Sequence, residues 1–331
     1  MRLAWRELTR QPGRFLTAGG ALTLIVVLLL VIGGILDALT DSSTGALRSQ
    51  SSPLVVFSRE SRDSLLRSRI EASQLDAIEA VHGVGTATGF GVSLLPAHVP
   101  GDDEPADVAV FGYEAANLRA PAPPGPGEGF ADRALEEDGV AVGQTLEVGS
   151  ARVPVRIVGW VEDTSYNLQG GLWVEADTWR RVLAENVPDA ALGDGAFQVA
   201  LVTPVREDDL ATVARAIEEQ VDGVRARTIE QAIAAIPGVS QQQSVFGAII
   251  AVTFTVAGLA VALFFALLTI ERIALLGVLK AVGASSRQLA AGLTVQAVLI
   301  AAGAFAIGGA LTIALANVMP ETIPFALEPG R

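Results

Sequence analysis

The sequence predicts a membrane protein with three α-helical spans and one extracytoplasmic domain of mixed α/β structure. Three stretches contain no charged residue, namely 15–36, 231–270 and 288–320, with 22, 40 and 33 residues. Each exceeds the roughly 20 apolar residues that a helix needs to cross a bilayer. Residues 37–244, by contrast, contain 15 Arg and 32 acidic residues and alternate between strand-like and helix-like patterns. This segment is long enough to bury a core of its own.

The N-terminal segment 1–14 has a net charge of +3 and leads directly into the first apolar stretch, residues 15–36. A cleaved signal peptide is the alternative to a retained span. Such peptides have an apolar region of about 7–15 residues followed by a cleavage site with small residues. Here the apolar stretch has 22 residues and ends in Leu36-Asp37-Ala38-Leu39. We therefore predict that residues 15–36 form a retained transmembrane helix.

The segment 37–244 has a net charge of −17 and contains short apolar runs that are rich in β-branched residues. These runs predict strands at 54–57, 108–111, 153–161 and 197–202. Two other stretches place apolar residues at helical spacing. They are 73–81, with Leu75, Ile78 and Val81, and 210–221, with Leu210, Val213, Ala214 and Ile217. The combination of predicted strands and predicted helices indicates a mixed α/β domain.

Both predicted helices of this domain end in the same pattern, Val-x-Gly-Val. The first ends in Val81-His82-Gly83-Val84 and the second in Val221-Asp222-Gly223-Val224. Glycine at such a position suits the left-handed end of a helix, and each pattern leads into a run with β propensity. We interpret this as a duplicated helix–strand unit, with chance recurrence in a chain rich in Ala, Val and Gly as the alternative.

Two further spans are predicted at 245–270 and 289–319, with the segment 271–288 between them. Residues 271–287 carry Arg272, Lys280 and Arg287 against Glu271, a net charge of +2. Short loops rich in Lys and Arg stay in the cytoplasm, so this segment and the N-terminus are both expected inside. Residues 37–244 and the C-terminal segment 320–331 are then expected outside.

The residue types exclude several classes of function. The chain has no cysteine, which removes disulfides and thiol chemistry. Its two histidines, His82 and His98, lack the spacing of zinc ligands or of a nucleophile–base pair. Its only lysine, Lys280, follows Leu279, so no phosphate-binding P-loop is present. The net charge of −13 argues against nucleic acid as a partner. We expect no catalytic residues and no metal site.

The segment between the second and third spans is the most informative part of the sequence. Its apolar residues recur at three-residue spacing, as Ile273, Leu276, Leu279 and Val282. Arg272 and Lys280 lie off that stripe, and Gly283-Ala284-Ser285 breaks the helix before the next span. This pattern predicts an amphipathic helix lying along the membrane, which is either an interfacial anchor or a docking helix for a cytoplasmic motor.

The run Gly277-Val278-Leu279-Lys280-Ala281-Val282-Gly283-Ala284-Ser285 resembles a signature of the FtsX-like (MacB/LolC-type, type VII) ABC-transporter permeases. The order of segments is also similar to that family: a short N-terminus, one span, a large outer domain, a second span and then this segment. Gly143-Gln144-Thr145-Leu146 and the run at 155–159 resemble a passage of the family's outer domain. The resemblance covers essentially the whole chain.

The resemblance implies a bacterial inner-membrane protein that works as a pair of permeases on a pair of cytoplasmic ATPase subunits. ATP and Mg²⁺ would then bind to the ATPase and not to this chain. The residues expected to contact the ATPase are Arg272, Gly277, Lys280, Gly283 and Ser285. We expect a homodimer packed through spans one and two at two pairs of small residues, Gly19-Gly20 and Gly33-Gly34.

The chain departs from the family pattern in two places. Leu275 stands where many members have an acidic residue. A fourth span is expected after Pro320, where this sequence continues for only 11 residues to Arg331. Among subfamilies, the chain looks most similar to the haem-exporter HrtB-type and DevC-type permeases. Asp37 and Met319 are candidate substrate contacts, with a helix-capping Asp and a lipid-facing Met as the alternatives.

The sequence therefore predicts the permease subunit of an ABC transporter that exports a hydrophobic or amphipathic substrate by transmitted motion. The alternative is an FtsX-type signalling subunit that regulates an extracytoplasmic partner and transports nothing. A membrane enzyme is disfavoured because no paired catalytic groups lie in or near the spans. A neighbouring ATPase with an efflux phenotype would favour the transporter, and a cell-wall hydrolase partner would favour the regulator.

Overall fold

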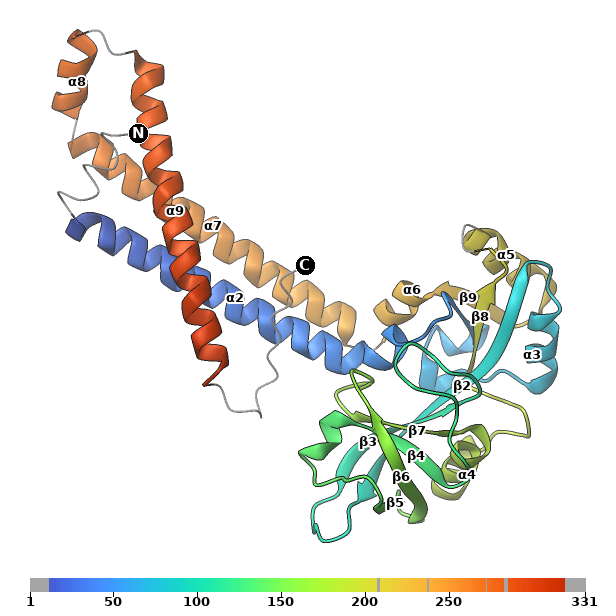
Figure 1. Ribbon diagram of the computed structural model, residues 1–331. Helices are drawn as coiled ribbons and strands as arrows, with labels where there is room; N and C mark the ends of the chain where they lie inside the picture. Colours follow the sequence, from blue (N-terminus) through green and yellow to red (C-terminus); the bar gives the residue numbers. More distant parts are fainter. Residues whose placement is uncertain (1–11, 207–208, 237, 272, 283–284, 319–331) are drawn as a thin grey trace. The chain divides into compact units, whose positions relative to one another are not determined.

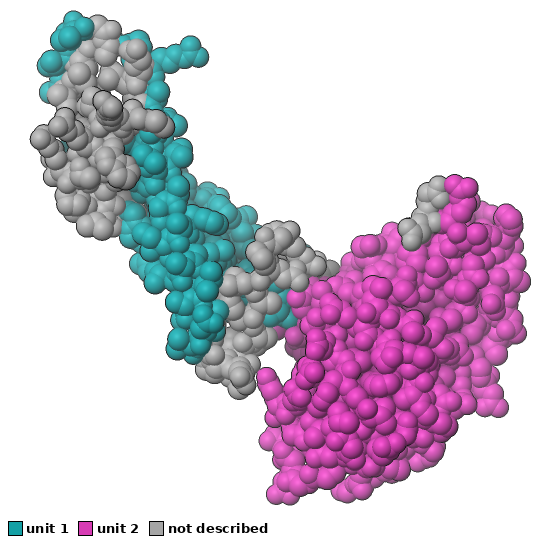
Figure 2. All heavy atoms as spheres, viewed as in Figure 1, with its two compact units in different colours: residues 1–38, 242–331 teal, residues 39–241 magenta. Residues whose placement is uncertain are grey.

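The computed structural model describes residues 12–206, 209–236, 238–271, 273–282 and 285–318. The chain divides into two compact units, residues 1–38 with 242–331 and residues 39–241 (Figure 2). We call the first the membrane unit and the second the outer domain.

The membrane unit contains three long apolar helices, α2 (Pro12–Arg48), α7 (Val239–Glu271) and α9 (Ser286–Ala316), among its described residues (Figure 1). A short helix, α8 (Ile273–Ala281), lies between α7 and α9 in the chain. Within the parts of the chain that the structure describes, three segments are long and apolar enough to cross a membrane, namely Gly19–Arg48, Ser244–Glu271 and Thr294–Ala316. The predicted class, a membrane α-helical protein with a mixed α/β domain, is confirmed.

Helix α2 does not end where the charge-free stretch ends. It continues beyond Leu36 through Asp37 and Asp41 to Arg48. Its last ten residues belong to the outer domain, where Thr44, Ala46 and Leu47 are almost completely buried. The interpretation of Asp37 as a cap at a helix end is therefore wrong, because Asp37 lies within continuous helix.

One half of the outer domain is a four-stranded antiparallel sheet. It contains β1 (Leu54–Ser58), α3 (Ala72–Glu79) and the first part of β2 (Val84–His98), then β8 (Val199–Pro204), α5 (Leu210–Gln220) and β9 (Val224–Thr228). The strand order β2-β8-β1-β9 is that of a ferredoxin-like split βαβ repeat. The predicted duplication is present, since each helix ends at a left-handed glycine, with φ of +95° at Gly83 and +77° at Gly223. The buried sides of α3 and α5 pack into one apolar core, which contains Ile78 of α3 and Ile217 of α5.

Strand β9 is the free edge of this sheet. The N–H of Ala226 on β9 donates to a carboxylate oxygen of Glu218 on α5 at 2.9 Å. Arg225 and Arg227 flank Ala226, and both lie within 4 Å of Asp63, with Arg227 Nε at 3.1 Å. One N–H group of this edge is therefore occupied by a side chain of the same molecule, and charged side chains flank it.

The other half is inserted between β2 and β8 and is a barrel. Its strands are β3 (Ala106–Tyr113), β4 (Glu128–Asp132), β5 (Thr145–Val148), β6 (Val153–Val161) and β7 (Gly170–Glu175). Strand pairing runs β2-β3-β7-β4-β6-β5 and returns to β2 through Ala97 and His98, so the ring is closed. Strand β2 pairs with β8 over its first half and with β3 over its second half, so it belongs to both halves.

The barrel interior holds the first apolar core, and helix α4 (Ala176–Asn186) packs against it. Trp179 of α4 is fully buried against two glycines of the barrel strands, Gly91 and Gly112. A Cβ on Gly112 would lie 2.6 Å from the Trp179 side chain, so this contact requires the absence of a side chain. Helix α6 (Ile229–Ala234) and four short 3₁₀ helices, Arg59–Ser61, Leu65–Arg67, Arg133–Glu136 and Pro188–Ala190, complete the domain.

A second core of the outer domain is aromatic. Phe90, Phe111, Tyr113 and Trp173 pack together, with the Phe111 and Trp173 ring centroids 4.5 Å apart. Ala46 and Leu47 of α2 join this cluster, and so do Ile236, which precedes α7, and Val239, the first residue of α7. The ends of both helices that lead to the membrane therefore contribute to the same core.

Candidate functional site

The segment predicted to bind an ATPase contains helix α8, which lies between α7 and α9 in the chain as the sequence predicted. Gly277 is in the middle of α8, and a Cβ added there would meet nothing within 4 Å. Lys280 lies in the last turn and is exposed. Ser285 is exposed directly before α9. Arg272 and Gly283 lie outside the described residues.

The predicted apolar stripe of α8 is exposed where its side chains are described. Ile273 retains 67% and Val282 82% of its accessible surface. The other two stripe residues, Leu276 and Leu279, have no described side chains. Val278, which is not part of the stripe, is 60% exposed as well, so apolar residues of α8 are exposed outside the predicted stripe, and the amphipathic character of this segment stays a prediction. Its contact with an ATPase stays a prediction.

Helices α2 and α9 pack against each other within the membrane unit. The contact face of α9 repeats every four residues and is buried throughout, as Gln296, Ile300, Ala304, Gly308 and Thr312. A Cβ on Gly308 would lie 2.7 Å from a methyl of Val26 and 3.3 Å from the Thr23 carbonyl oxygen of α2. This is the small-residue packing that brings membrane helices together. The four-residue repeat of Ala304, Gly308 and Thr312 was the sequence signal for it, and our sequence analysis missed it.

The four glycines predicted for dimer packing have different surroundings. A Cβ on Gly19 would lie 4.0 Å from Ile300 of α9, so this position faces a helix of the same chain. Gly34 is buried. Gly20 and Gly33 would meet nothing within 4 Å. A second copy of the chain would therefore find open surface at Gly20 and Gly33, and the dimer itself stays a prediction.

In the outer domain, the end of α2 is held by the loop between β6 and β7, residues 162–169, which we call the β6–β7 loop. The Ser165 carbonyl oxygen accepts a hydrogen bond from Ala46 N at 3.1 Å. Asn167 N donates to the Ser43 carbonyl oxygen at 3.2 Å, and Leu168 N donates to the Ser42 carbonyl oxygen at 3.1 Å. These backbone bonds fix the helix to the barrel.

Two features allow this close approach. A Cβ on Gly45 would lie 2.6 Å from the Asp163 carbonyl oxygen, so only glycine fits at this point of α2. The loop itself has three non-glycine residues with left-handed backbone, Asp163, Asn167 and Leu168, at φ of 54°, 52° and 66°. Such conformations are unfavourable for side-chain-bearing residues and persist where surrounding contacts hold them.

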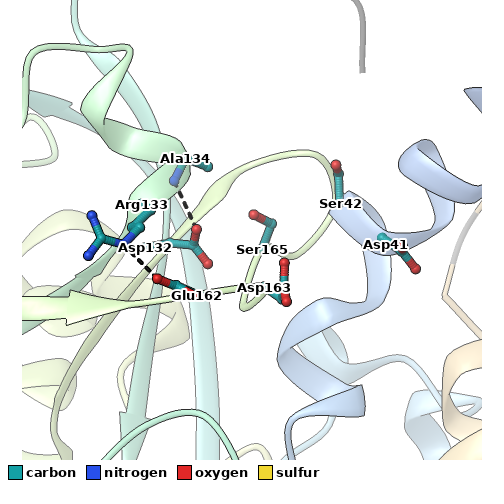
Figure 3. Close-up of a pocket in the computed structure, with 8 residues that line it drawn as sticks. All are labelled: Asp41, Ser42, Asp132, Arg133, Ala134, Glu162, Asp163 and Ser165. Carbon is teal, nitrogen blue, oxygen red and sulfur yellow. Dashed lines mark hydrogen bonds and ion pairs between the residues drawn. The ribbon is translucent and has the colours of Figure 1, made fainter. Parts of the chain in front are cut away.

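A pocket of about 340 Å³ lies beside this junction (Figure 3). It is lined by Asp41, Ser42, Asp132, Arg133, Ala134, Glu162, Asp163 and Ser165. In Figure 3, Asp163 and Ser165 lie between Ser42 of α2 and the group around Asp132. Arg133 binds Glu162, with Nε and Oε1 2.7 Å apart.

Asp132 is the buried member of the pocket lining and has a structural role. Its side chain accepts hydrogen bonds from Ala134 N at 2.9 Å and from Thr164 N at 2.6 Å and Thr164 Oγ1 at 2.5 Å. These contacts cap the 3₁₀ helix at Arg133–Glu136 and hold the start of the β6–β7 loop. Because its carboxylate already accepts three hydrogen bonds from the protein, we assign Asp132 a structural role at this junction.

Burial raises the pKa of Tyr166, also in the β6–β7 loop, to about 12. Burial likewise raises the pKa of Tyr113, whose hydroxyl donates to the Pro121 carbonyl oxygen at 3.0 Å. Both phenols therefore stay neutral and act as packing groups. Within the described ranges, no group of three or more His, Asp or Glu residues could hold a metal ion. Asp37 is half-buried within α2, and Met319 lies outside the described residues.

Comparison with known proteins shows which family the C-terminal region is similar to. Residues 247–329 match the family described as FtsX-like permease C-terminal. The match contains most of α7, the whole of α8 and α9, and the run Gly277–Ser285.

Three solved structures are similar to part of the chain. One is the extracellular domain of the noncanonic ABC-type transporter YknZ from Gram-positive bacteria, with 12% identity, 54% of this chain and 100% of that chain covered, and a TM-score of 0.37. Another is the periplasmic region of MacB from Actinobacillus actinomycetemcomitans, with 12% identity, 56% and 92% covered, and a TM-score of 0.37. The third is a domain of a putative permease protein from Porphyromonas gingivalis, with 14% identity, 55% and 89% covered, and a TM-score of 0.34.

The family match therefore confirms the resemblance that the run Gly277–Ser285 suggested, whereas similarity to HrtB-type and DevC-type permeases stays a prediction. Residues 247–329 of this chain are similar to the family described as FtsX-like permease C-terminal.

Proposed function

We propose that this chain is the permease subunit of an ABC transporter that exports a hydrophobic or amphipathic substrate. A separate cytoplasmic ATPase binds and hydrolyses ATP, and its conformational change acts on α8. The observation that carries this proposal is the position of α8 between two spans, inside the segment that matches the FtsX-like permeases. Arg272, Gly277, Lys280, Gly283 and Ser285 are the proposed contacts with the ATPase.

The charge distribution supports the proposed orientation. The segment that contains α8 has a net charge of +2, whereas residues 37–244 have a net charge of −17. Positive loops remain in the cytoplasm, so α8 is on the side where ATP is available. The outer domain is then outside, and the permease acts as a pair of copies in a bacterial inner membrane.

The test reconstitutes the full chain in lipid nanodiscs with an ABC ATPase from the same organism, and measures ATP hydrolysis with and without the chain. Gly277→Val adds a side chain whose Cβ would meet no described atom of this chain within 4 Å, so we take a loss of stimulation to report a contact with the ATPase. Gly258→Val is the matched control, because Gly258 lies in α7 and also has open space. We expect Gly277→Val and Lys280→Glu to abolish stimulation, and Gly258→Val and Lys280→Arg to retain it.

Transport is measured separately, as ATP-dependent uptake of an amphipathic fluorescent dye and of a fluorescent phospholipid into inside-out vesicles. Uptake of either probe that is lost in Lys280→Glu supports export. Stimulated ATP hydrolysis without uptake of either probe would favour the signalling role. Equal stimulation by the chain and by all four variants would refute the docking role of α8.

A further inference from the structure

The exposed tip of the β6–β7 loop carries a leucine at a position that favours glycine. Tyr166 and Gln169 pair through two backbone N–H to C=O hydrogen bonds, of 2.9 and 3.0 Å, so Asn167 and Leu168 are the central residues of a tight hairpin turn. Both central residues have positive φ, 52° and 66°. Turns of this kind favour asparagine followed by glycine, because a Cβ is unfavourable at positive φ. Leucine at position 168 therefore strains the turn.

The side chain of Leu168 has few contacts within the outer domain that would offset this strain, since it is 61% exposed. Its backbone N–H donates to the Ser42 carbonyl oxygen of α2 at 3.1 Å, and a glycine would make the same hydrogen bond. Strained backbone positions cluster where a residue serves a contact or a function. A leucine that is both strained and largely exposed therefore indicates a contact outside the outer domain.

The chain between this loop and the first span is short. Leu36 is the last residue of the charge-free stretch 15–36, and Ser42 follows six residues later in the same helix. Six residues span about 9 Å in an α-helix and no more than about 20 Å in any conformation. The headgroup region on each side of the hydrocarbon core is about 5–8 Å thick. A loop tip that is bound to Ser42 is therefore within reach of the lipid headgroups.

The charged side chains around the β6–β7 loop are paired, which permits an approach to lipid. Three ion pairs, with nitrogen and oxygen 2.8, 3.2 and 2.7 Å apart, are Arg48–Asp41, Arg119–Asp163 and Arg133–Glu162. Each pair is neutral, whereas residues 37–244 as a whole have a net charge of −17. Anionic lipids repel an acidic surface but not a neutral one. This side of the domain is therefore suited to a lipid surface.

We propose that the tip of the β6–β7 loop binds the lipid surface beside α2, with the Leu168 side chain inserted among the headgroups of the leaflet from which α2 emerges. Removal of this apolar side chain from water offsets the strain of the turn. Leucine is one of the residues with which peripheral segments enter the membrane interface. The contact requires that α2 spans the membrane, and it is independent of nucleotide and of the proposed function.

A fluorescent label quenched by lipid tests this contact in the full chain. Because the chain has no cysteine, Asn167→Cys gives a single site, next to Leu168, for the environment-sensitive label NBD. The labelled chain is placed in nanodiscs of phosphatidylcholine, with and without phosphatidylcholine that carries a doxyl spin label near its headgroup. The doxyl group quenches NBD only at close range, so quenching reports contact with lipid.

Two other exposed apolar residues of the outer domain provide matched label sites. Leu118 is 69% exposed, and its N–H donates to the carbonyl oxygen of Ser49 at 2.9 Å, seven residues further along the chain than the carbonyl that binds Leu168. Val205 is 71% exposed and directly follows β8. We expect strong quenching of the label in Asn167→Cys and weak quenching in Leu118→Cys and Val205→Cys.

Substitutions at Leu168 test whether its side chain makes the contact. Leu168→Gly in the Asn167→Cys background should lose most of the quenching, and Leu168→Met should retain it. Glycine suits the positive φ at this position, so Leu168→Gly should leave the fold intact. Unchanged near-ultraviolet circular dichroism of the buried Trp173 and Trp179 checks this.

Equal quenching at all three label sites would overturn the proposal, and so would quenching at position 167 that is unchanged in Leu168→Gly. A shift of NBD emission to shorter wavelength without quenching would show that protein, and not lipid, covers the loop. Quenching that appears only after anionic phosphatidylglycerol is added to the nanodiscs would assign the contact to the arginines around the loop. Both of these results would also overturn the insertion of Leu168.

Discussion

Replacing Asp132 by alanine is expected to destabilise the outer domain strongly. The Asp132 carboxylate is 3% exposed and accepts three hydrogen bonds, one from Ala134 N and two from Thr164. Thr164 is fully buried, so its N–H and hydroxyl would lose their acceptor with no access to water. Each buried donor left unpaired costs about 1–3 kcal/mol. Loss of the cap at Ala134 adds about 1 kcal/mol. We expect Asp132→Ala to lower the free energy of unfolding by about 3–7 kcal/mol.

Urea unfolding of the full chain in nanodiscs, followed by tryptophan fluorescence, measures this effect. Three of the four tryptophans, Trp160, Trp173 and Trp179, lie in the outer domain, and the last two are fully buried. The change in fluorescence therefore reports mainly on this domain. The slope of the transition should remain unchanged, since the same surface is exposed on unfolding.

Asp163→Asn is the control for a neighbouring carboxylate. Asp163 lies 3.2 Å from Arg119, and the two side chains are 65% and 50% exposed. An exposed ion pair contributes about 0–1 kcal/mol, and asparagine tolerates the left-handed backbone at this position. The reasoning is refuted if Asp132→Ala costs no more than Asp163→Asn. Asp132→Asn should fall between them, because its amide retains one oxygen acceptor.

Three further predictions follow from other parts of the chain. A cysteine at Ser58 should react with an impermeant thiol reagent in intact cells, and one at Ser286 should not; the reverse result would mean that the orientation is wrong. Gly112→Ala should lower the free energy of unfolding by about 1–3 kcal/mol, measured by urea unfolding, because its methyl group would overlap Trp179. Asp138→Asn should raise the thermal stability at pH 7. Burial, and then the charges of nearby carboxylates, raise the pKa of Asp138 above its ordinary value. The ionised side chain therefore weakens folding above that pKa. The gain should vanish below about pH 3.9, where Asp is protonated in both states, and a gain that persists there would contradict this cause.

Local patterns were sufficient to predict some elements of the outer domain, whereas β4, β5, β7 and α4 were not predicted. The β-branched run at 153–161 became β6 with the same bounds, and the apolar spacing at 210–221 became α5. The closed barrel was not predictable in this way, because β2 changes partner at Phe90 from β8 to β3. Pairings between residues distant in sequence leave no periodic signal in either strand.

The junction at the end of α2 also escaped prediction, for two physical reasons. Asp37 ends the charge-free stretch, and we took that boundary for the end of the helix. The chain nevertheless continues with helix-compatible residues to Arg48, where Asp41 and Arg48 form an ion pair at 2.8 Å. In the β6–β7 loop, Asn167 and Leu168 adopt positive φ without glycine. They are the central residues of a tight turn that is closed by backbone hydrogen bonds between Tyr166 and Gln169 and that also contacts α2. Asparagine is common in such turns, but leucine is not, so the loop sequence carried only a weak signal.

The hydrogen bond from Ala226 to Glu218 has a consequence for molecules that share one membrane surface. Proteins confined to a bilayer meet at high local concentration, which favours association through any unpaired strand. On β9 the Ala226 N–H is occupied by a side chain of the same molecule, and Arg225 and Arg227 place charge on either side. A neighbouring strand would have to displace Glu218 and approach two guanidinium groups before it could pair. Edge-to-edge pairing of two copies through β9 would therefore first require the Ala226–Glu218 hydrogen bond to break.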